Sequence, residues 1–270
     1  MAHDSPQNLP GAGGKDWEYV CPKYIPFVSA EAEGKQRKPL FAVQWIKGGK
    51  YVLTGSSDGD IIQWNAEKFD RKAHNVHNST VQAICVTNYE KFIISGDKKG
   101  NIAYCDSKIN RHNNIKAHLD VAVRDLSFSA ASLKFMSCSD DRTARIFDFL
   151  TAKQEFEYNG HGSDVKTCDW HPTTCLVATG AQDNYVKLWD PRTGADVQAM
   201  QPHNKVINKV RWNPINGNWL LTGSQDMSLK IHDIRMMKEL QHFQGHDNQV
   251  TTVAWHPHKE ELFVSGSLSG

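Results

Sequence analysis

The chain has 270 residues, of which 39% are hydrophobic and 23% are charged, so it can bury a substantial core. Its 31 Lys and Arg residues against 30 Asp and Glu residues give a net charge of +1, which excludes a uniformly basic nucleic-acid-binding coat but not a local basic patch. There is no run of about 18 apolar residues and no apolar segment at the start, so we expect neither a membrane-spanning helix nor a secretory signal.

A repeated unit of 41 to 43 residues organises the sequence. Its clearest copy runs from Gly160-His161 to Leu188-Trp189-Asp190. The opening histidines are His77, His118, His161, His203 and His246, and the closing aromatic position holds Trp64, Cys105, Phe147, Trp189 and His232. This period, with Gly-His and Trp-Asp at its ends, is typical of β-propeller blades of four strands each.

Short β-rich runs bounded by Gly, Asp and Ser predict the strands in chain order. Residues 1–37 should be disordered or irregular, and residues 38–270 should form an all-β propeller. The runs are 41–45, 51–55 and 61–64; 81–86, 92–96 and 102–105; 123–128, 135–139 and 144–148; 165–170, 176–180 and 186–190; 207–212, 219–223 and 229–233; 250–255 and 262–266. We therefore expect blades one to five and two strands of blade six, from a longer and seven-bladed protein.

Six cysteines and 13 histidines raise the question of disulfide and metal chemistry. Five cysteines lie in or beside predicted strands and no C-x-x-C pair occurs, which favours buried thiols in the cytosol or nucleus. No histidine has zinc-ligand spacing to a cysteine or an acidic residue. His171 and His256 share one strand-to-turn position in two W-H-P segments, so we interpret them as structural. We predict no metal and no cofactor.

Two sets of polar residues recur at matching offsets. They are His161, Thr179, Asp183 and Trp189 in blade four, and His118, Ser137, Asp141 and Phe147 in blade three. A histidine, a hydroxyl and a carboxylate could imitate a nucleophilic triad, but these sets occur once per blade, whereas an active site occurs once per protein. From residue 41 the sequence resembles WD-repeat (WD40) proteins. The resemblance implies that each set is a buried hydrogen-bonded chain that joins the strands of its blade.

Three blades depart from this pattern, and we expect them to be less rigid or specialised for a partner. Blade one has Thr54, Asp58 and Trp64 without an opening histidine; blade two has Lys99 at the turn aspartate and Cys105 at the tryptophan; blade five has His203, Thr222 and Asp226 with His232 at the tryptophan.

Longer stretches resemble one subfamily, the WD-repeat subunits of the cleavage and polyadenylation specificity factor. The most specific are D-V-K-T-C-D-W-H-P from Asp164 and N-G-N-W-L-L-T-G from Asn216, and the resemblance covers about residues 38–270. It implies a nuclear, non-enzymatic scaffold for pre-mRNA 3′-end processing. Its implied partners are a large multi-propeller subunit, a CCCH zinc-finger subunit and single-stranded pre-mRNA with an AAUAAA-type signal, but no membrane and no small-molecule substrate.

The same resemblance directs attention to the loop after blade one, where relatives carry aromatic residues that contact RNA bases. Phe69, flanked by Lys68, Arg71 and Lys72, is a candidate stacking platform with phosphate-binding side chains. Alternatively, the segment is an exposed outer strand whose phenylalanine packs against blade two. Residues 1–33 lack the basic arm of relatives. Recognition of the RNA signal is therefore weakened, left to another subunit, or made by a basic arm further upstream.

Two other functions remain open. Trp-Asp-Pro-Arg at 189–192, with a weaker copy ending at Arg235, could present an arginine as substrate receptors of cullin-type ubiquitin ligases do, although such tetrapeptides often simply end a strand. A generic WD-repeat scaffold of another complex is the second. Enzymatic activity is disfavoured, because no Gly-rich phosphate loop or metal-binding motif occurs.

Overall fold

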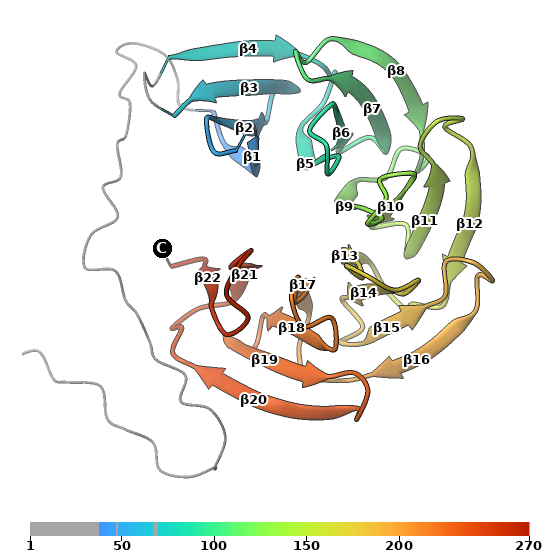
Figure 1. Cartoon of the computed structure of the whole chain (residues 1–270), viewed down its shortest axis with the longest axis vertical. Helices are drawn as coiled ribbons and strands as arrows, with labels where there is room; N and C mark the ends of the chain where they lie inside the picture. Colours follow the sequence, from blue (N-terminus) through green and yellow to red (C-terminus); the bar gives the residue numbers. More distant parts are fainter. Residues whose placement is uncertain (1–37, 47, 67–69, 270) are drawn as a thin grey trace, which may run out of the picture. The chain divides into compact units, whose positions relative to one another are not determined.

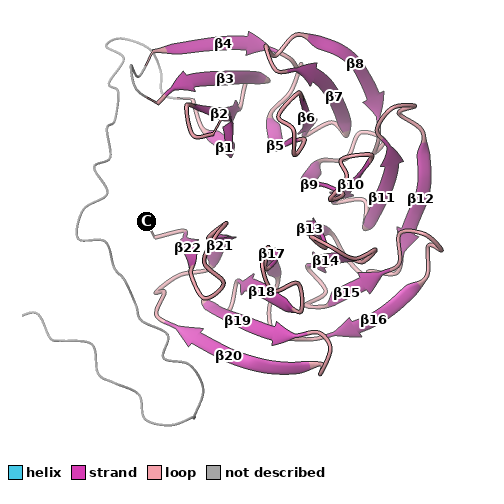
Figure 2. Cartoon of the chain, viewed as in Figure 1, coloured by secondary structure: helices cyan, strands magenta, loops and turns pink. Residues whose placement is uncertain are grey.

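The computed structural model describes residues 38–46, 48–66 and 70–269, and all regular structure in these ranges is β-strand (Figure 2). The described residues contain no helix, and hence none that could cross a membrane. The prediction of an all-β fold is confirmed. The expected irregular segment 1–37 lies outside the described residues.

The strands form six antiparallel sheets, numbered one to six in chain order, each in simple up-and-down order. Sheet one contains β1 (Leu40–Ile46), β2 (Tyr51–Ser56), β3 (Asp60–Asn65) and β4 (Arg71–Asn75), and sheet two β5 (Val81–Val86), β6 (Phe92–Asp97), β7 (Asn101–Asp106) and β8 (Arg111–Lys116). Sheet three contains β9 (Val123–Phe128), β10 (Lys134–Ser139), β11 (Thr143–Asp148) and β12 (Gln154–Asn159), and sheet four β13 (Val165–Trp170), β14 (Val177–Ala181), β15 (Val186–Trp189) and β16 (Asp196–Met200). Sheet five contains β17 (Ile207–Trp212), β18 (Trp219–Ser224), β19 (Ser228–Asp233) and β20 (Lys238–Gln244), and sheet six β21 (Val250–Trp255) and β22 (Phe263–Ser267).

Residues 38–269 place these sheets as blades around a common centre (Figure 1). The first strand of each sheet lies nearest the centre and contacts the first strand of the next sheet, from β1 through to β21. The fourth strands β4, β8, β12, β16 and β20 follow one another along the rim. This is the propeller that the 41-to-43-residue period predicts.

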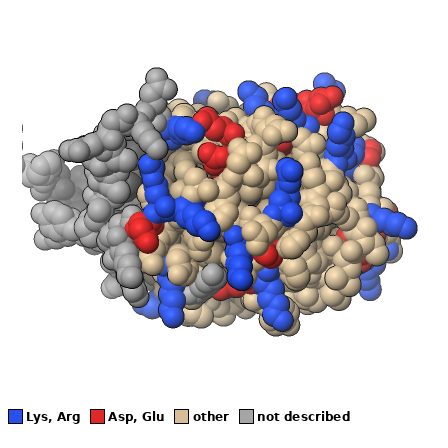
Figure 3. All heavy atoms as spheres, turned by 90° about the horizontal axis from the view of Figure 1, so that it is seen from above, with Lys and Arg blue, Asp and Glu red and all other residues tan. Residues whose placement is uncertain are grey.

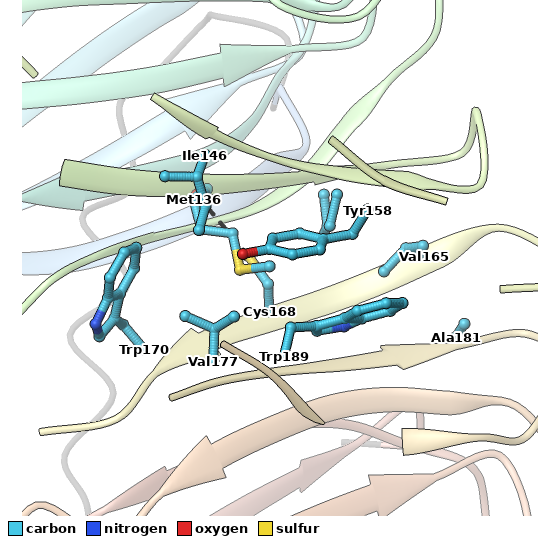
Figure 4. Packing of buried hydrophobic residues seen from close by; sticks show 11 residues of the cluster. Met136, Ile146, Tyr158, Val165, Cys168, Trp170, Val177, Ala181 and Trp189 are labelled. Carbon is cyan, nitrogen blue, oxygen red and sulfur yellow. Dashed lines mark hydrogen bonds between the residues drawn. The ribbon is translucent and has the colours of Figure 1, made fainter. Parts of the chain in front are cut away.

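The hydrophobic core lies between adjacent sheets, because each blade buries its faces against its neighbours. Between sheets three and four, Met136, Ile146 and Tyr158 pack with Cys168 and Trp189, and all five side chains are almost fully buried (Figure 4). Cys168 therefore acts here as a small core residue.

The turn between the second and third strand of each full sheet requires one residue with positive φ. Sheets one and two use Gly59 (φ +90°) and Gly100 (φ +81°), whereas sheets three to five use Arg142, Asn184 and Met227, each at φ 70°. At Gly100 a Cβ atom would lie 1.5 Å from the carbonyl oxygen of His118, so only glycine fits. Both glycine carbonyls in turn accept a hydrogen bond from the backbone N–H of the following histidine, His77 or His118, at 3.0 Å.

Candidate functional site

The most complete hydrogen-bonded set lies in sheet four. Trp189 Nε1 donates to the Thr179 hydroxyl at 2.9 Å, and His161 Nε2 lies 2.7 Å from that hydroxyl. His161 Nδ1 lies 3.0 Å from the Asp183 carboxylate. Burial lowers the pKa of His161, although Asp183 opposes the shift. The ring is therefore neutral near neutral pH, with its proton on Nδ1 facing Asp183, and Nε2 accepts from the threonine.

Sheets three and five repeat the histidine, hydroxyl and carboxylate of this set. The distances are 2.8 Å for His118–Ser137, 2.7 Å for His118–Asp141, 2.8 Å for His203–Thr222 and 2.9 Å for His203–Asp226. Phe147, in the tryptophan position, stacks on Phe135 with 5.2 Å between ring centroids. His232 replaces the tryptophan in sheet five; its Nδ1 has no partner among the described residues, and burial lowers its pKa to about 4.

Sheet two supplies its carboxylate from a different position, which sequence analysis missed. Lys99 occupies the turn position, but Asp97, two residues earlier at the end of β6, lies 3.3 Å from His77 Nδ1. Burial alone would raise the pKa of Asp97, but hydrogen bonds from His77 and Asn101 outweigh it and hold the pKa well below the usual range. His77 Nε2 lies 2.7 Å from the Ser95 hydroxyl, so the histidine, hydroxyl and carboxylate of the set are all present. The signal available in the sequence was the aspartate in the Gly-Asp-Lys-Lys-Gly turn.

Sheet one keeps only one end of the set. Trp64 Nε1 donates to the Thr54 hydroxyl at 2.9 Å. Asp58, which has no histidine to accept from, instead forms an exposed ion pair with Lys38.

These polar sets are not arranged for nucleophilic catalysis. The hydroxyl-bearing residues Ser95, Ser137, Thr179 and Thr222 have no exposed surface, so a substrate cannot reach their oxygen atoms. In the described parts of the chain, no group of three or more His, Cys, Asp or Glu side chains is placed to hold a metal ion. The geometry is that of a buried staple between strands.

A buried ionic group near the centre of the molecule was also missed from sequence. The Asp125 carboxylate on β9 lies 2.9 Å from Lys209 Nζ and 3.0 Å from Arg211 Nη1, both on β17. Thr167 on β13 donates to the same carboxylate at 2.9 Å. Although burial would raise the pKa of Asp125, Arg211 and Lys209 hold it well below the usual range. The group thus ties together the first strands of sheets three, four and five.

Two of the predicted RNA-binding residues fall in a gap of the described chain, and the other two come just after it. Phe69 and Lys68 lie outside the described residues. Arg71 and Lys72 open β4, where both are exposed. The Arg71 guanidinium lies 5.7 Å from the centroid of the Trp64 ring, within cation–π range. Neither cation forms an ion pair with a carboxylate of the described residues.

The remaining candidate motifs form local turn contacts. Arg192 is 71% exposed at its side chain and pairs with Asp190 at 3.1 Å, two residues before it. His171 Nδ1 accepts from the backbone N–H groups of Thr173 and Thr174 at 3.1 and 2.9 Å, and His256 Nδ1 accepts similarly from His258 at 3.0 Å. Both W-H-P histidines therefore cap turns.

Comparison with known proteins identifies both a family and individual relatives. A model of the WD domain, G-beta repeat, matches residues 32–65, 110–148, 152–190, 194–233 and 237–270. The polyadenylation factor subunit 2 of Neurospora crassa is 35% identical over 187 residues, which cover 69% of this chain and 28% of the relative. The protein of the same name from Gibberella zeae is 35% identical over 184 residues, covering 68% and 30%.

A more distant relative, the GATOR2 complex protein Wdr24 of Drosophila melanogaster, is 27% identical over 170 residues, covering 60% of this chain and 22% of that protein. The matched part of the chain spans less than a third of the length of each of these three relatives.

Proposed function

The chain belongs to the WD-repeat family, and from that premise we propose that it is a scaffold and RNA-recognition subunit of the pre-mRNA 3′-end cleavage and polyadenylation complex. The observation that carries the proposal is its similarity to proteins named polyadenylation factor subunit 2 in several fungi. In this proposal the protein acts in the nucleus and is not an enzyme. It binds the large multi-propeller subunit and a CCCH zinc-finger subunit.

The proposed RNA contact is the segment around the start of β4. Phe69 stacks one base, while Lys68, Arg71 and Lys72 neutralise neighbouring phosphates. What supports this is that Arg71 and Lys72 are exposed and form no ion pair with any described carboxylate. Because the net charge is only +1, RNA affinity depends on few contacts, and the zinc-finger subunit supplies the remainder.

The test is RNA binding by the reconstituted complex with an A/U-rich hexamer at several salt concentrations. Phe69→Ala should weaken binding by roughly 1–3 kcal/mol, because one stacked base is lost. Arg71→Ala should also weaken binding and should flatten its salt dependence by about 0.7 in the log–log slope, since one phosphate contact is lost. The matched controls are Tyr185→Ala, an exposed aromatic in sheet four, and Arg192→Ala. Equal affinity of all five proteins at every salt concentration would contradict the proposal.

A second candidate function is that of a substrate receptor for a cullin-type ubiquitin ligase. The observation that favours it is the exposure of Arg192, which an adaptor could reach. Against it, the arginine is already paired with Asp190 in its own turn. Arg192→Ala should leave association with polyadenylation subunits intact; removal of a cullin adaptor from the purified complex would favour this second function.

A further inference from the structure

The outer strands of the first two sheets differ in charge from those of the next three. β4 and β8 together contain four Lys and Arg residues and no Asp or Glu. β12, β16 and β20 together contain one lysine and four carboxylates. Residues 71–116 carry eight Lys and Arg against three Asp and Glu, a net charge of +5 in a chain whose total is +1.

In each of sheets three to five, one carboxylate of the outer strand is neutralised by a cation on the strand beside it. Arg145, Lys187 and Lys230 occupy equivalent positions, two residues before the tryptophan position. They pair with Glu157 at 3.3 Å, Asp196 at 3.0 Å and Glu239 at 2.8 Å, respectively. In sheets one and two the equivalent residues are the buried, uncharged Ile62 and Ala103. The charges of these two rims are therefore not balanced in the same way.

The cations of the first two rims have no ionic partner among the residues that the structure describes. We define the basic rim as Arg71, Lys72, Lys108, Arg111 and Lys116, all of them exposed. None of them forms an ion pair within residues 38–46, 48–66 and 70–269. Two of the acidic residues nearby are engaged in other contacts: Asp97 is buried against His77, and Asp106 accepts from the backbone N–H groups of Lys108 and Asn110.

The basic rim is continuous from one sheet to the next. β8 follows β4 along the edge of the molecule (Figure 1), and Arg111 Nη1 donates to the carbonyl of Val76, just after β4, at 2.8 Å. In Figure 3, which looks onto this side, Lys and Arg side chains spread over the surface, with smaller groups of acidic side chains among them. The exposed side chains between these cations on β8 are His112, Asn113 and Asn114, which can hydrogen-bond to phosphate or sugar oxygens.

Two simpler explanations do not account for this surface. Lysines on edge strands prevent pairing with other sheets, but β12 and β16 are outer strands too and carry carboxylates, so edge protection does not select positive charge. A protein-binding surface usually centres on exposed aromatic or aliphatic side chains and is depleted in lysine. No large hydrophobic side chain of β4 or β8 is exposed.

We propose that the basic rim binds the backbone phosphates of single-stranded RNA, as a track that runs across β4 and β8. The proposal rests on the proposed function, because it extends the same RNA beyond the bases held near Phe69. The contacts are made to phosphate and sugar, so they add affinity and salt dependence without reading sequence.

The experiment uses the intact complex and two fluorescent RNAs, the A/U-rich hexamer and an RNA of about 20 nucleotides that contains it. Lys108→Glu/Lys116→Glu alters only sheet two and spares the loop 65–73. Lys153→Glu/Lys238→Glu is the matched control, since both lysines are exposed, lie next to or in β12 and β20, and produce the same change in net charge.

On the longer RNA, the rim variant should reduce the log–log salt slope by about 1.4, which is on the order of a tenfold loss of affinity at about 0.15 M salt. The control should be unchanged, and the hexamer should bind wild type and rim variant alike. Equal binding of the longer RNA by the rim variant and the control would overturn the proposal that the basic rim binds RNA. In that case, weaker binding of the hexamer by Phe69→Ala would still support the proposed function. Normal RNA binding with loss of a protein subunit from the rim variant would make this surface a protein interface and also overturn the proposal.

Discussion

Sheets one and two have the same fold as sheets three to five but differ from them in charge pairing and in turn residues. In the later sheets the third strand provides a cation that neutralises a carboxylate on the rim, as Lys187 does for Asp196. In the described part of the first two sheets the rim cations have no such partner, and the turns use glycine where the later sheets use a residue with a side chain. The repeat therefore determines the positions of the strands, whereas the positions of the charges differ between blades.

The two regions also build their internal hydrogen-bonded sets differently. Sheets three to five take the carboxylate from the turn, as with Asp183. Sheet two takes it from Asp97 within the strand, and sheet one has no histidine in its set. The first two sheets thus depart from the repeat both inside and on the rim, and this coincidence is what one would expect if they serve a partner.

The largest effect should come from the turn glycines. Gly100→Ala should destabilise the protein by more than about 3 kcal/mol, because its Cβ would collide with the carbonyl oxygen of His118 and alanine resists positive φ. Arg142→Ala, at the equivalent turn of sheet three, should change the free energy of unfolding by less than about 0.5 kcal/mol. Urea unfolding curves measure both. Similar midpoints for the two variants would show that the turns of the two regions are interchangeable.

Asp97 and Asp183 should contribute similarly to the free energy of unfolding despite their different positions. Alanine at either position leaves a buried histidine nitrogen without its acceptor and should cost roughly 1–3 kcal/mol. Adding Lys99→Asp to Asp97→Ala places a carboxylate at the standard turn position and should recover part of that loss. Thermal unfolding of the three variants is the measurement. An Asp97→Ala protein as stable as wild type would mean that sheet two has no functioning set.

The sequence predicted the first three strands of each blade well, and the outer strands poorly. Strands such as β10 contain alternating or continuous apolar residues because neighbouring blades cover them. By contrast, β8, with the sequence Arg-His-Asn-Asn-Ile-Lys, is exposed and shows no periodic pattern of apolar residues. The turn position of Asp183 followed from the repeat. Asp97 did not, because it lies two residues out of register, and Asp125 did not, because its partners on β17 lie more than 80 residues away.

The loss of stability of sheet three at low pH should depend on the protonation of Asp141. Burial alone would raise the pKa of this carboxyl, but the hydrogen bond and charge of His118 outweigh it and lower the pKa to about 2. A carboxyl with a lowered folded-state pKa contributes stability above its unfolded value, near pH 4. That contribution, about 2 kcal/mol, is lost as the pH falls from about 4 through about 2. Asp141→Asn should therefore flatten the stability profile in this window, as measured by unfolding at several pH values; an unchanged slope would contradict the assignment.

The most direct test of the account is ultraviolet cross-linking of pre-mRNA to the intact complex, with the cross-linked peptides of this subunit identified by mass spectrometry. If sheets one and two carry the RNA, the cross-links should fall between residues 65 and 116, from the loop before β4 to the end of β8. Peptides that contain β12, β16 and β20 should remain free of RNA, because the cations beside these strands already pair with their carboxylates. Cross-links confined to those three strands, or a subunit that purifies in the complex without any RNA cross-link, would contradict it.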